Sequence, residues 1–172
     1  MKTSRLYVCS LAKVVDTVRG SGARSLVTIL TAGASLVRPS EIPPPRHLRI
    51  AVSDIDAPVE GHILPGAEHI GRLLDFLAEW DRNEPLVIHC YAGVSRSPAA
   101  AFIAACALGP ERAEWDVAQD LRRASPTATP NRRLVALADH MLDRQGRMVA
   151  AITRIGRGAD CFEGAPFALE LG

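Results

Sequence analysis

Four short apolar runs divide the first half of the chain, and each has the length of a β-strand. They cover Leu6–Cys9, Ser25–Leu30, Leu48–Val52 and Leu86–His89. The last run follows Pro85 and is a continuous series of aliphatic residues, which is typical of a strand buried on both faces. The pattern therefore predicts four strands, and the last of them is covered on both sides.

Segments with helical periodicity fill much of the remaining chain. Apolar residues recur at helical spacing in Pro65–Trp80, and Pro98–Leu108 is almost wholly apolar, which predicts a buried helix. Glu111–Arg123 has the pattern of a charged amphipathic helix, and another helix is predicted from Leu134 toward Thr153. Strands alternating with helices predict a three-layer α/β fold, with a central, mainly parallel sheet of four to five strands flanked by helices.

The composition fits one globular domain. The chain has 172 residues, of which 48% are hydrophobic and 23% are charged, and domains commonly have about 100–200 residues. We expect a single domain over residues 1–172 with its core at about 5–154. The glycine-rich residues 155–172 are expected to form an irregular tail that packs on the body through Phe162, Phe167 and Leu169.

Charge and hydropathy argue against several classes of protein. A formal net charge of +1 does not suit a general nucleic-acid-binding protein, and no apolar stretch reaches the roughly 20 residues of a membrane-spanning helix. Charged residues interrupt the N-terminal segment, so we expect no signal peptide and a cytoplasmic location. Four scattered cysteines lack metal-binding spacing and are expected to be reduced thiols. They are Cys9, Cys90, Cys106 and Cys161.

The most informative segment runs from His89 to Pro98, where the last predicted strand gives way to the most apolar helix. Ligands bind at this end of the strands in an α/β sheet. Gly93 lets a short loop turn its amides inward as an anion-binding nest, and the helix N-terminus and Arg96 add positive charge. The segment therefore predicts a site for a tetrahedral oxyanion. Its expected binding residues are Tyr91, Ala92, Gly93, Val94, Ser95 and Arg96.

A cysteine at the base of such a loop has distinctive chemistry. Amide dipoles and a neighbouring cation favour the thiolate, so Cys90 is expected to attack a bound phosphoryl group and form a thiophosphate intermediate. Arg96 and the amides would stabilise the phosphoryl oxygens, and Ser97 would donate its hydroxyl to the departing sulfur. His89 is expected to orient the loop. The alternative is a cysteine that only fills space, and it leaves the residues around Cys90 unexplained.

The spacing His-Cys-x-x-Gly-x-x-Arg-Ser, formed by residues 89–97, resembles the signature of the cysteine-dependent protein tyrosine phosphatases. The chain length and the late position of the motif resemble the dual-specificity and bacterial tyrosine phosphatase-like branch of that superfamily. The resemblance covers about residues 26–142. It implies that the domain is a phosphatase domain that works through a cysteine thiolate.

The resemblance also implies a general acid, an aspartate on a mobile loop upstream of the cysteine. Asp54 and Asp56 both qualify. Asp54 is preferred because it directly follows a predicted strand and would lie at the same sheet edge as the Cys90 loop. Asp56 is the reserve, and Glu60 is a poorer candidate because it lies further along the loop.

A second similarity to the family lies at Pro130-Asn131, before the last long predicted helix. In dual-specificity enzymes the asparagine of this step helps to brace the phosphate loop, which implies the same role for Asn131. The Gly-Phe pair that usually follows is replaced here by Arg133-Leu134. Asn131 as a plain helix N-cap is an equally good interpretation and is compatible with the first.

The function implied is hydrolysis of a phosphomonoester. We expect a phosphorylated protein or a small phosphomonoester as substrate, with phosphotyrosine first and phosphoserine and phosphothreonine left open. The loop between Cys90 and Arg96 has no lysine, which argues against a phosphoinositide phosphatase. That activity stays an alternative, as does a non-catalytic phosphate-binding module, while a sulfur transferase or arsenate reductase fits the motif less well. No metal or other cofactor is expected, because the thiolate and Arg96 supply the chemistry. The sequence does not predict the oligomeric state.

Overall fold

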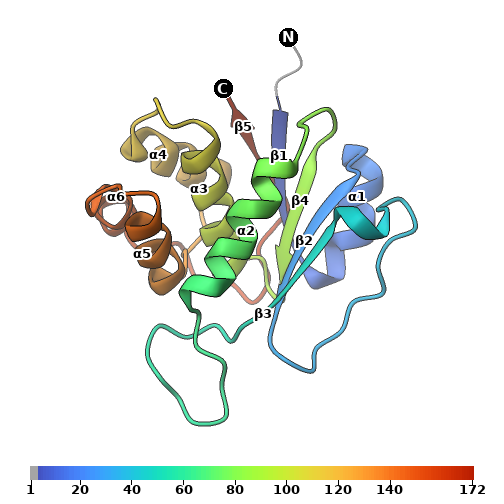
Figure 1. Ribbon diagram of the computed structural model, residues 1–172, viewed down its shortest axis with the longest axis horizontal. Helices are drawn as coiled ribbons and strands as arrows, with labels where there is room; N and C mark the ends of the chain where they lie inside the picture. The colour runs from blue at the N-terminus through green and yellow to red at the C-terminus, as the bar shows by residue number, and fades with distance from the viewer. Residues whose placement is uncertain (1–3) are drawn as a thin grey trace.

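A five-stranded sheet forms the centre of the computed structural model, which describes residues 4–172 (Figure 1). The strands are β1 (Ser4–Ser10), β2 (Ser25–Leu30), β3 (His47–Ala51), β4 (Leu86–Cys90) and β5 (Phe167–Leu171). They lie side by side in the order β3-β2-β4-β1-β5, and all neighbours are parallel except the pair of β1 and β5. The predicted mainly parallel α/β sheet is confirmed.

Helices cover both faces of the sheet and complete the three layers. The α-helices are α1 (Val14–Ser21), α2 (Ala67–Glu79), α3 (Arg96–Leu108), α4 (Glu114–Ala124), α5 (Arg132–Met141) and α6 (Arg147–Ile155). Short 3-10 helices lie at Leu11–Lys13 and Pro44–Arg46. The larger apolar core joins the sheet to α2, α3, α4, α5 and α6, and a smaller core lies under α1. Helix α3 is buried from Arg96 to Cys106, as its apolar sequence predicts.

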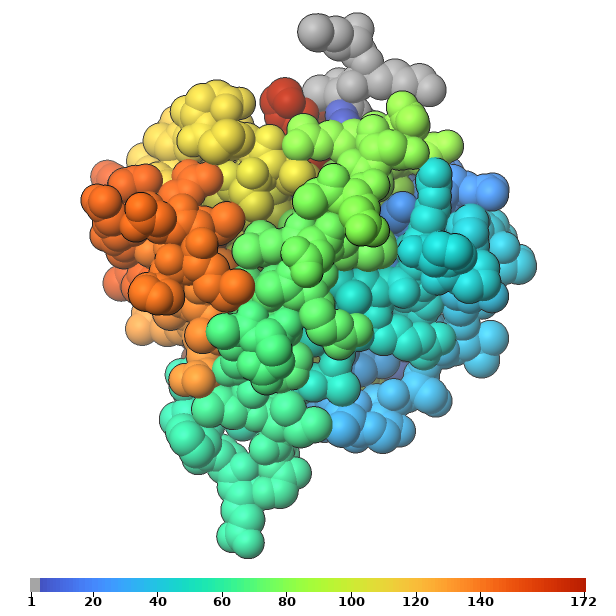
Figure 2. Space-filling view, in the orientation of Figure 1, coloured from blue at the N-terminus to red at the C-terminus, as the bar shows by residue number. Residues whose placement is uncertain are grey.

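The parallel strands bring several loops together at one edge of the sheet. Ser10 at the end of β1 pairs with Cys90 at the end of β4, so the loops that follow these two strands start side by side. The segments after β2 and β3 leave the sheet at this same edge, since both strands are parallel to β4. Residues 52–66, between β3 and α2, project from the lower end of the molecule in the space-filling view (Figure 2).

The tail is more regular than the sequence analysis predicts. Residues 167–171 form β5, which pairs antiparallel with β1 and buries Phe167, Leu169 and Leu171. The prediction of an irregular segment over 155–172 is therefore wrong for its last part. The prediction that Phe162 packs on the body is also wrong, because its side chain is fully exposed. A five-residue strand with one alternating apolar face becomes stable once the edge of β1 offers it hydrogen-bond partners.

The helix predicted from Leu134 toward Thr153 is two helices, α5 and α6. The chain turns between them, where Asp143 and Gln145 adopt left-handed backbone conformations with φ of 52° and 53°. Asp139 stabilises the turn because its carboxylate accepts hydrogen bonds from backbone N–H groups at the start of α6, including Met148 at 2.7 Å. Helix α1 is an element that the sequence analysis does not predict. No helix in the described part of the chain combines the length and the apolar character needed to cross a membrane.

Candidate active site

The Cys90 loop, residues 90–97, connects the end of β4 to the start of α3. Its carbonyl groups are tied outward by neighbouring backbone. The carbonyl oxygen of Tyr91 accepts from Leu11 N at 3.1 Å, and that of Ala92 accepts from Gly164 N at 2.8 Å. The segment that leads into α5 supplies the other ties, because Val94 O accepts from Thr129 N and Ser95 O accepts from Asn131 N.

The outward carbonyls fix the direction of the amides. A trans peptide group points its N–H opposite to its C=O, and the chain has no cis peptide bond among the described residues. The N–H groups that follow the tied carbonyls therefore point to the inner side of the loop. No N–H of residues 91–95 donates to another described residue. The loop is thus a concave set of unused donors of the kind that binds anions.

Gly93 is essential to this loop shape. Its φ is +71°, a left-handed conformation that L side chains rarely adopt. A Cβ at this position would also lie 2.9 Å from the backbone of Cys9 and Ser10 at the end of β1. The loop can approach β1 this closely only because residue 93 has no side chain.

Cys90 lies at the base of the loop and is 2% exposed. Its Sγ is 3.0 Å from the hydroxyl oxygen of Ser97 in the first turn of α3, so Ser97 can donate a hydrogen bond to the sulfur. Two other buried thiols are held in the neutral form. Burial raises the pKa of Cys9 to about 11, with the nearby Cys90 adding to the rise, and burial raises the pKa of Cys106 to about 12. Cys161 is exposed, and all four cysteines are free.

Arg96 connects the carboxyl ends of three strands. It is 7% exposed, and its Nη1 donates to the carbonyl of Val52 after β3 at 3.0 Å and to the hydroxyl of Thr31 after β2 at 3.2 Å. These two bonds hold one nitrogen of the guanidinium. Its Nε is buried and has no hydrogen-bond partner among the described residues. An unpaired buried donor is costly, by about 1–3 kcal/mol, and the cost falls on the side chain that the sequence analysis assigns to a bound oxyanion.

His89 orients Cys90 through a polar chain across three strands. Its Nδ1 lies 3.2 Å from the carbonyl oxygen of Cys90, so Nδ1 carries the proton and donates. Its Nε2 then accepts from the Thr28 hydroxyl at 2.8 Å, and the Thr28 oxygen accepts from Nε2 of His47 at 2.8 Å. Burial lowers the pKa of both histidines to about 4, which keeps both rings neutral. Both ring nitrogens of His89 are thus engaged in hydrogen bonds, one to the backbone of Cys90 and one to Thr28.

Thr28 and His47 support the site through His89, and the pattern of the sequence did not predict this. Strand β2 is buried and apolar except for two hydroxyl residues, Ser25 and Thr28. Thr28 is paired in register with His89. A hydroxyl within such a strand is a usable signal, because buried polar groups require partners. The partner itself follows only from the strand order.

Asp54 and not Asp56 contacts the Cys90 loop. The Oδ1 atom of Asp54 accepts from the Ser95 hydroxyl at 2.7 Å and from Nδ2 of Asn131 at 2.9 Å. Both bonds fall on the same carboxylate oxygen, and Oδ2 forms no hydrogen bond with any residue of 4–172. Asp56 is exposed and forms no hydrogen bond or ion pair with any residue of 4–172.

Asn131 combines the two roles that the sequence leaves open. Its Oδ1 caps α5 by accepting from Leu134 N at 3.0 Å, and its backbone N–H donates to Ser95 O in the loop. Its Nδ2 also donates to the carbonyl of Ile55 at 3.2 Å, next to Asp54. One residue thus joins the Cys90 loop, the loop after β3 and helix α5. Arg133 adds another tie, since its Nε donates to Pro65 O at 2.6 Å.

Comparison with known proteins was informative only at the level of structure. No family model matches the chain, and no curated protein sequence matches it. Among solved structures, a mouse protein described as a "putative dual specificity phosphatase", complexed with zinc tungstate, is similar with a TM-score of 0.62 and 18% identity over 86% of each chain.

Two further structures give the same result. Human DUSP28 has a TM-score of 0.60 and 18% identity over 81% of this chain and 89% of its own. The PTP-2 phosphatase of Cydia pomonella has a TM-score of 0.59 and 21% identity over 78% of this chain and 84% of its own. The chain therefore has the fold of the dual-specificity branch of the cysteine-dependent protein tyrosine phosphatases.

Proposed function

We propose that the chain is a phosphomonoester hydrolase that works through a cysteinyl-phosphate intermediate, with phosphotyrosine in proteins as its preferred substrate. One observation carries the proposal. The buried Nε of Arg96 has no partner among the described residues, and it belongs to the same short loop as the Cys90 sulfur and the unused amides of residues 91–95.

An oxyanion would satisfy all of these donors. The guanidinium is anchored through Nη1 alone, so its Nε and Nη2 edge can donate to two oxygens of one phosphoryl group. The inward amides can donate to the same oxygens, and they need no reorganisation as charge spreads in the transition state. The tungstate complex of the similar mouse protein supports this assignment, since tungstate is a tetrahedral oxyanion.

The first chemical step transfers the phosphoryl group to sulfur. The Cys90 thiolate attacks phosphorus, the S–P bond forms and the bond to the ester oxygen breaks. The proton on Oδ2 of Asp54 passes to that oxygen, so the alcohol or phenol leaves neutral. Ser95 and Asn131 hold the other oxygen of Asp54 and thereby position it as the general acid.

The second step hydrolyses the intermediate. Asp54, now ionised, accepts a proton from a water molecule whose oxygen attacks phosphorus, and the P–S bond breaks to release inorganic phosphate. The sulfur leaves as a thiolate, to which the Ser97 hydroxyl at 3.0 Å donates a hydrogen bond. Asp56 has no part in either step.

Phosphotyrosine is favoured over other esters on two grounds. Its phenolic oxygen is a better leaving group than the alkoxide of phosphoserine or phosphothreonine. The loop residues 91–95 include no lysine that would match the additional phosphates of an inositol lipid.

Turnover of p-nitrophenyl phosphate tests the proposal. We expect the unmodified chain to release phosphate and Cys90→Ser to release none while still binding inorganic phosphate. Rapid acid quenching followed by peptide mass spectrometry should find one phosphoryl group on the peptide that contains Cys90. Cys106→Ala is the control, because that thiol is buried in α3 and belongs to no part of the site. Phosphate binding without turnover in the unmodified chain would instead identify a phosphate-binding module.

A further inference from the structure

A groove lies directly beside the Cys90 loop, on the side formed by β1 and the tail. Its volume is about 560 Å³. Three stretches of chain line it, namely the 3-10 helix that follows β1, the first loop residues after Cys90, and the tail between α6 and β5. The lining residues are Leu11, Ala12, Tyr91, Ala92, Phe162 and Glu163.

Backbone hydrogen bonds fix the three walls relative to one another. Leu11 N donates to Tyr91 O at 3.1 Å, and Gly164 N donates to Ala92 O at 2.8 Å. The Ser10 hydroxyl donates to the carboxylate of Glu163 at 2.5 Å. The groove is thus built by the same contacts that turn the loop carbonyls outward, so its position relative to Cys90 is set.

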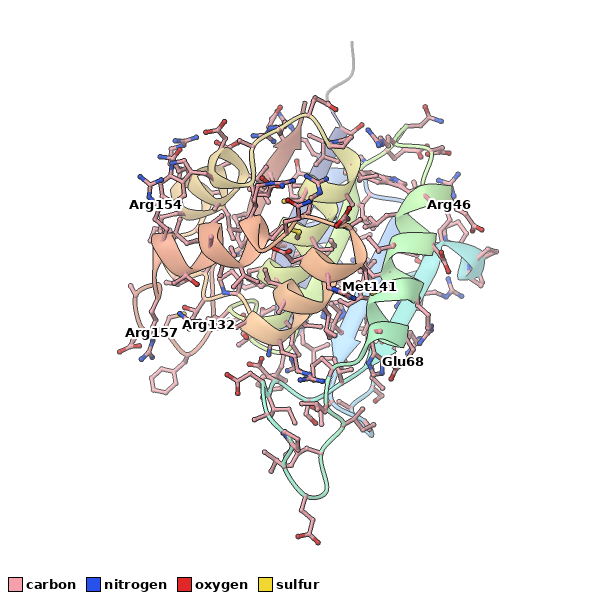
Figure 3. The ribbon with its side chains drawn as sticks, turned by 60° about the vertical axis from the view of Figure 1, so that its left-hand side comes forward. Arg46, Glu68, Arg132, Met141, Arg154 and Arg157 are labelled. Carbon is pink, nitrogen blue, oxygen red and sulfur yellow. The ribbon has the colours of Figure 1, made fainter. Side chains whose placement is uncertain are left out.

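The tail approaches the loop as closely as backbone allows. A Cβ on Gly164 would lie 2.9 Å from the carbonyl oxygen of Gly93. The tail passes the carboxyl ends of β4 and β1 before it turns into β5 (Figure 1). Arg157, near the start of this segment, and Arg132, at the start of α5, both lie on the left-hand side of the view in Figure 3. Close packing of the tail places Phe162 and Glu163 at the rim of the site.

Two aromatic side chains are exposed on this groove. Phe162 is fully exposed at 104% of its reference area, and Tyr91 is 68% exposed. The chain has only four phenylalanines and two tyrosines. Large aromatic rings held in water beside a concave surface are typical of a recognition site and not of a stabilising core.

We propose that this groove binds an apolar side chain next to the phosphotyrosine of a protein substrate, with Phe162 as the specificity-determining residue; the inference rests on the proposed function. The groove is continuous with the phosphate site, because Tyr91 and Ala92 belong to both. When the phosphate of a peptide sits over Cys90, a residue next to the phosphotyrosine can therefore reach these walls.

The negative charge of the groove disfavours acidic ligands. Glu163 is the one acidic or basic residue among those that line the groove. It repels an acidic residue next to the phosphotyrosine, and it opposes contact with the anionic surface of a phosphoinositide-containing membrane. The occupant that fits is a leucine-like residue in a protein segment.

Three phosphotyrosine peptides that differ only at the two flanking positions test this inference. With leucine, serine or glutamate at both positions, we expect kcat/KM to be roughly tenfold higher for the leucine peptide than for the serine peptide, and lowest for the glutamate peptide. Phe162→Ala should bring the leucine-to-serine ratio to about two or below. Glu163→Gln keeps an acceptor for Ser10 and should raise kcat/KM on the glutamate peptide by about threefold.

Val149→Ala is the matched control, because Val149 is an apolar residue of α6 that is 38% exposed and lies outside the groove. It should leave the relative kcat/KM values of the three peptides unchanged. Binding of the same peptides to Cys90→Ser, followed by fluorescence polarisation, reads the discrimination without turnover.

The outcomes separate the two proposals. Turnover of p-nitrophenyl phosphate with equal kcat/KM for the leucine and serine peptides would overturn the groove assignment and leave the proposed function intact. Discrimination in binding with no turnover of any substrate would support the groove and overturn the hydrolase. Vesicles of phosphatidylinositol phosphate in phosphatidylcholine, if hydrolysed faster than every peptide and affected by Phe162→Ala, would assign the groove to a lipid and refute the peptide.

Discussion

Arg96 shows how one side chain combines structure and chemistry. Its Nη1 is anchored to Val52 and Thr31, so the loops after β2 and β3 hold the guanidinium in place. Its Nε is left buried without a partner among the described residues. The protein folds with this unsatisfied donor, and the binding of an oxyanion would recover the lost hydrogen-bond energy. Asp54 is also held on one side only, because its Oδ1 accepts two hydrogen bonds while its Oδ2 accepts none from residues 4–172.

Substitution of the two candidate acids should separate them. Asp54→Asn removes the proton donor without changing side-chain size, so kcat for phenyl phosphate should fall by roughly 10²–10⁴-fold. For p-nitrophenyl phosphate, whose leaving group needs little protonation, the decrease should be much smaller. Asp56→Asn is the matched control and should change neither rate, because Asp56 lies outside the hydrogen-bond network of the site. The reverse pattern would transfer the role to Asp56.

At the scale of elements, the site depends on loops that are braced by other loops. The Cys90 loop is tied to the end of β1, to residues 129–131 and to the tail, and each tie uses a carbonyl of the loop. Such bracing makes the amide nest rigid before any ligand arrives. A preorganised set of dipoles is more effective in catalysis than one that must be assembled around the substrate.

Two glycine-to-alanine substitutions test how strongly the shape of the Cys90 loop depends on its close approach to β1. Gly93→Ala should destabilise the fold by about 2 kcal/mol or more, since it adds left-handed strain to a contact of 2.9 Å with the backbone of β1. Gly71→Ala lies within α2, where the new methyl group would meet only Met141 Cε at 3.8 Å. It should stabilise the fold by roughly 0.5–1 kcal/mol. Urea unfolding measures the free energy of unfolding of both variants. Equal changes in the two variants would show that the loop adapts to a side chain at position 93.

The sequence predicts those elements whose own residues carry the signal. Strand β4 and helix α3 follow from their apolar composition, and the Cys90 loop follows from a dense motif between them. Strand β5 did not follow, because its stability depends on the free edge of β1, which is more than 150 residues away in the sequence. The break between α5 and α6 depends on Asp139 capping the next helix, and the pattern of apolar positions does not reveal a cap in advance.

The same distinction applies to the site. The motif itself points to Cys90, Arg96 and Ser97, while the choice between Asp54 and Asp56 depends on which of them reaches Ser95. The supports of His89 and the tail contact at Gly164 come from residues at large sequence separation. Contacts of this kind are set by strand order and packing, which a single sequence does not state.

At the scale of the whole molecule, the polar chain of His47, Thr28 and His89 joins three adjacent strands beneath the site. It lies within the sheet, and all of its hydrogen bonds are formed while both imidazoles are neutral. Protonation of His89 at Nε2 would leave two donors facing the Thr28 hydroxyl oxygen, and protonation of His47 at Nδ1 would create a half-buried cation near Arg49 and Arg38. The stability of the molecule is therefore linked to the charge of two internal histidines.

Stability should consequently fall as the pH is lowered from about 6.5 to 4. Burial lowers the pKa of His47 and His89 to about 4 in the folded chain, against about 6.5 in the unfolded chain. Between these values the unfolded state binds more protons, so acid favours unfolding. For His89, which is fully buried, the loss is of the order of 3 kcal/mol. Urea unfolding at pH 7.5, 6.5, 5.5 and 4.5 should show this slope.

The pH range in which stability is lost distinguishes the contribution of the histidines from that of the carboxylates. Ion pairing and hydrogen bonds lower the pKa of Glu41 and Asp81, and stability gained from such groups is lost only below their ordinary pKa of about 4. The double variant His47→Gln, His89→Asn should therefore flatten the profile above pH 5 and leave the acidic part in place. A profile above pH 5 that is equally steep in the variant would show that other groups carry the slope.

The tie between Gly164 and the Cys90 loop has a consequence for the order of events during synthesis. The loop leaves the ribosome well before the tail, and roughly seventy residues separate Gly93 from Gly164. At about 5–20 residues per second, the nascent chain spends several seconds with its Cys90 loop braced by the segment after β1 and then by residues 129–131, but not yet by the tail. Phosphate affinity in the growing chain should therefore rise late, when the tail arrives and closes the last carbonyl.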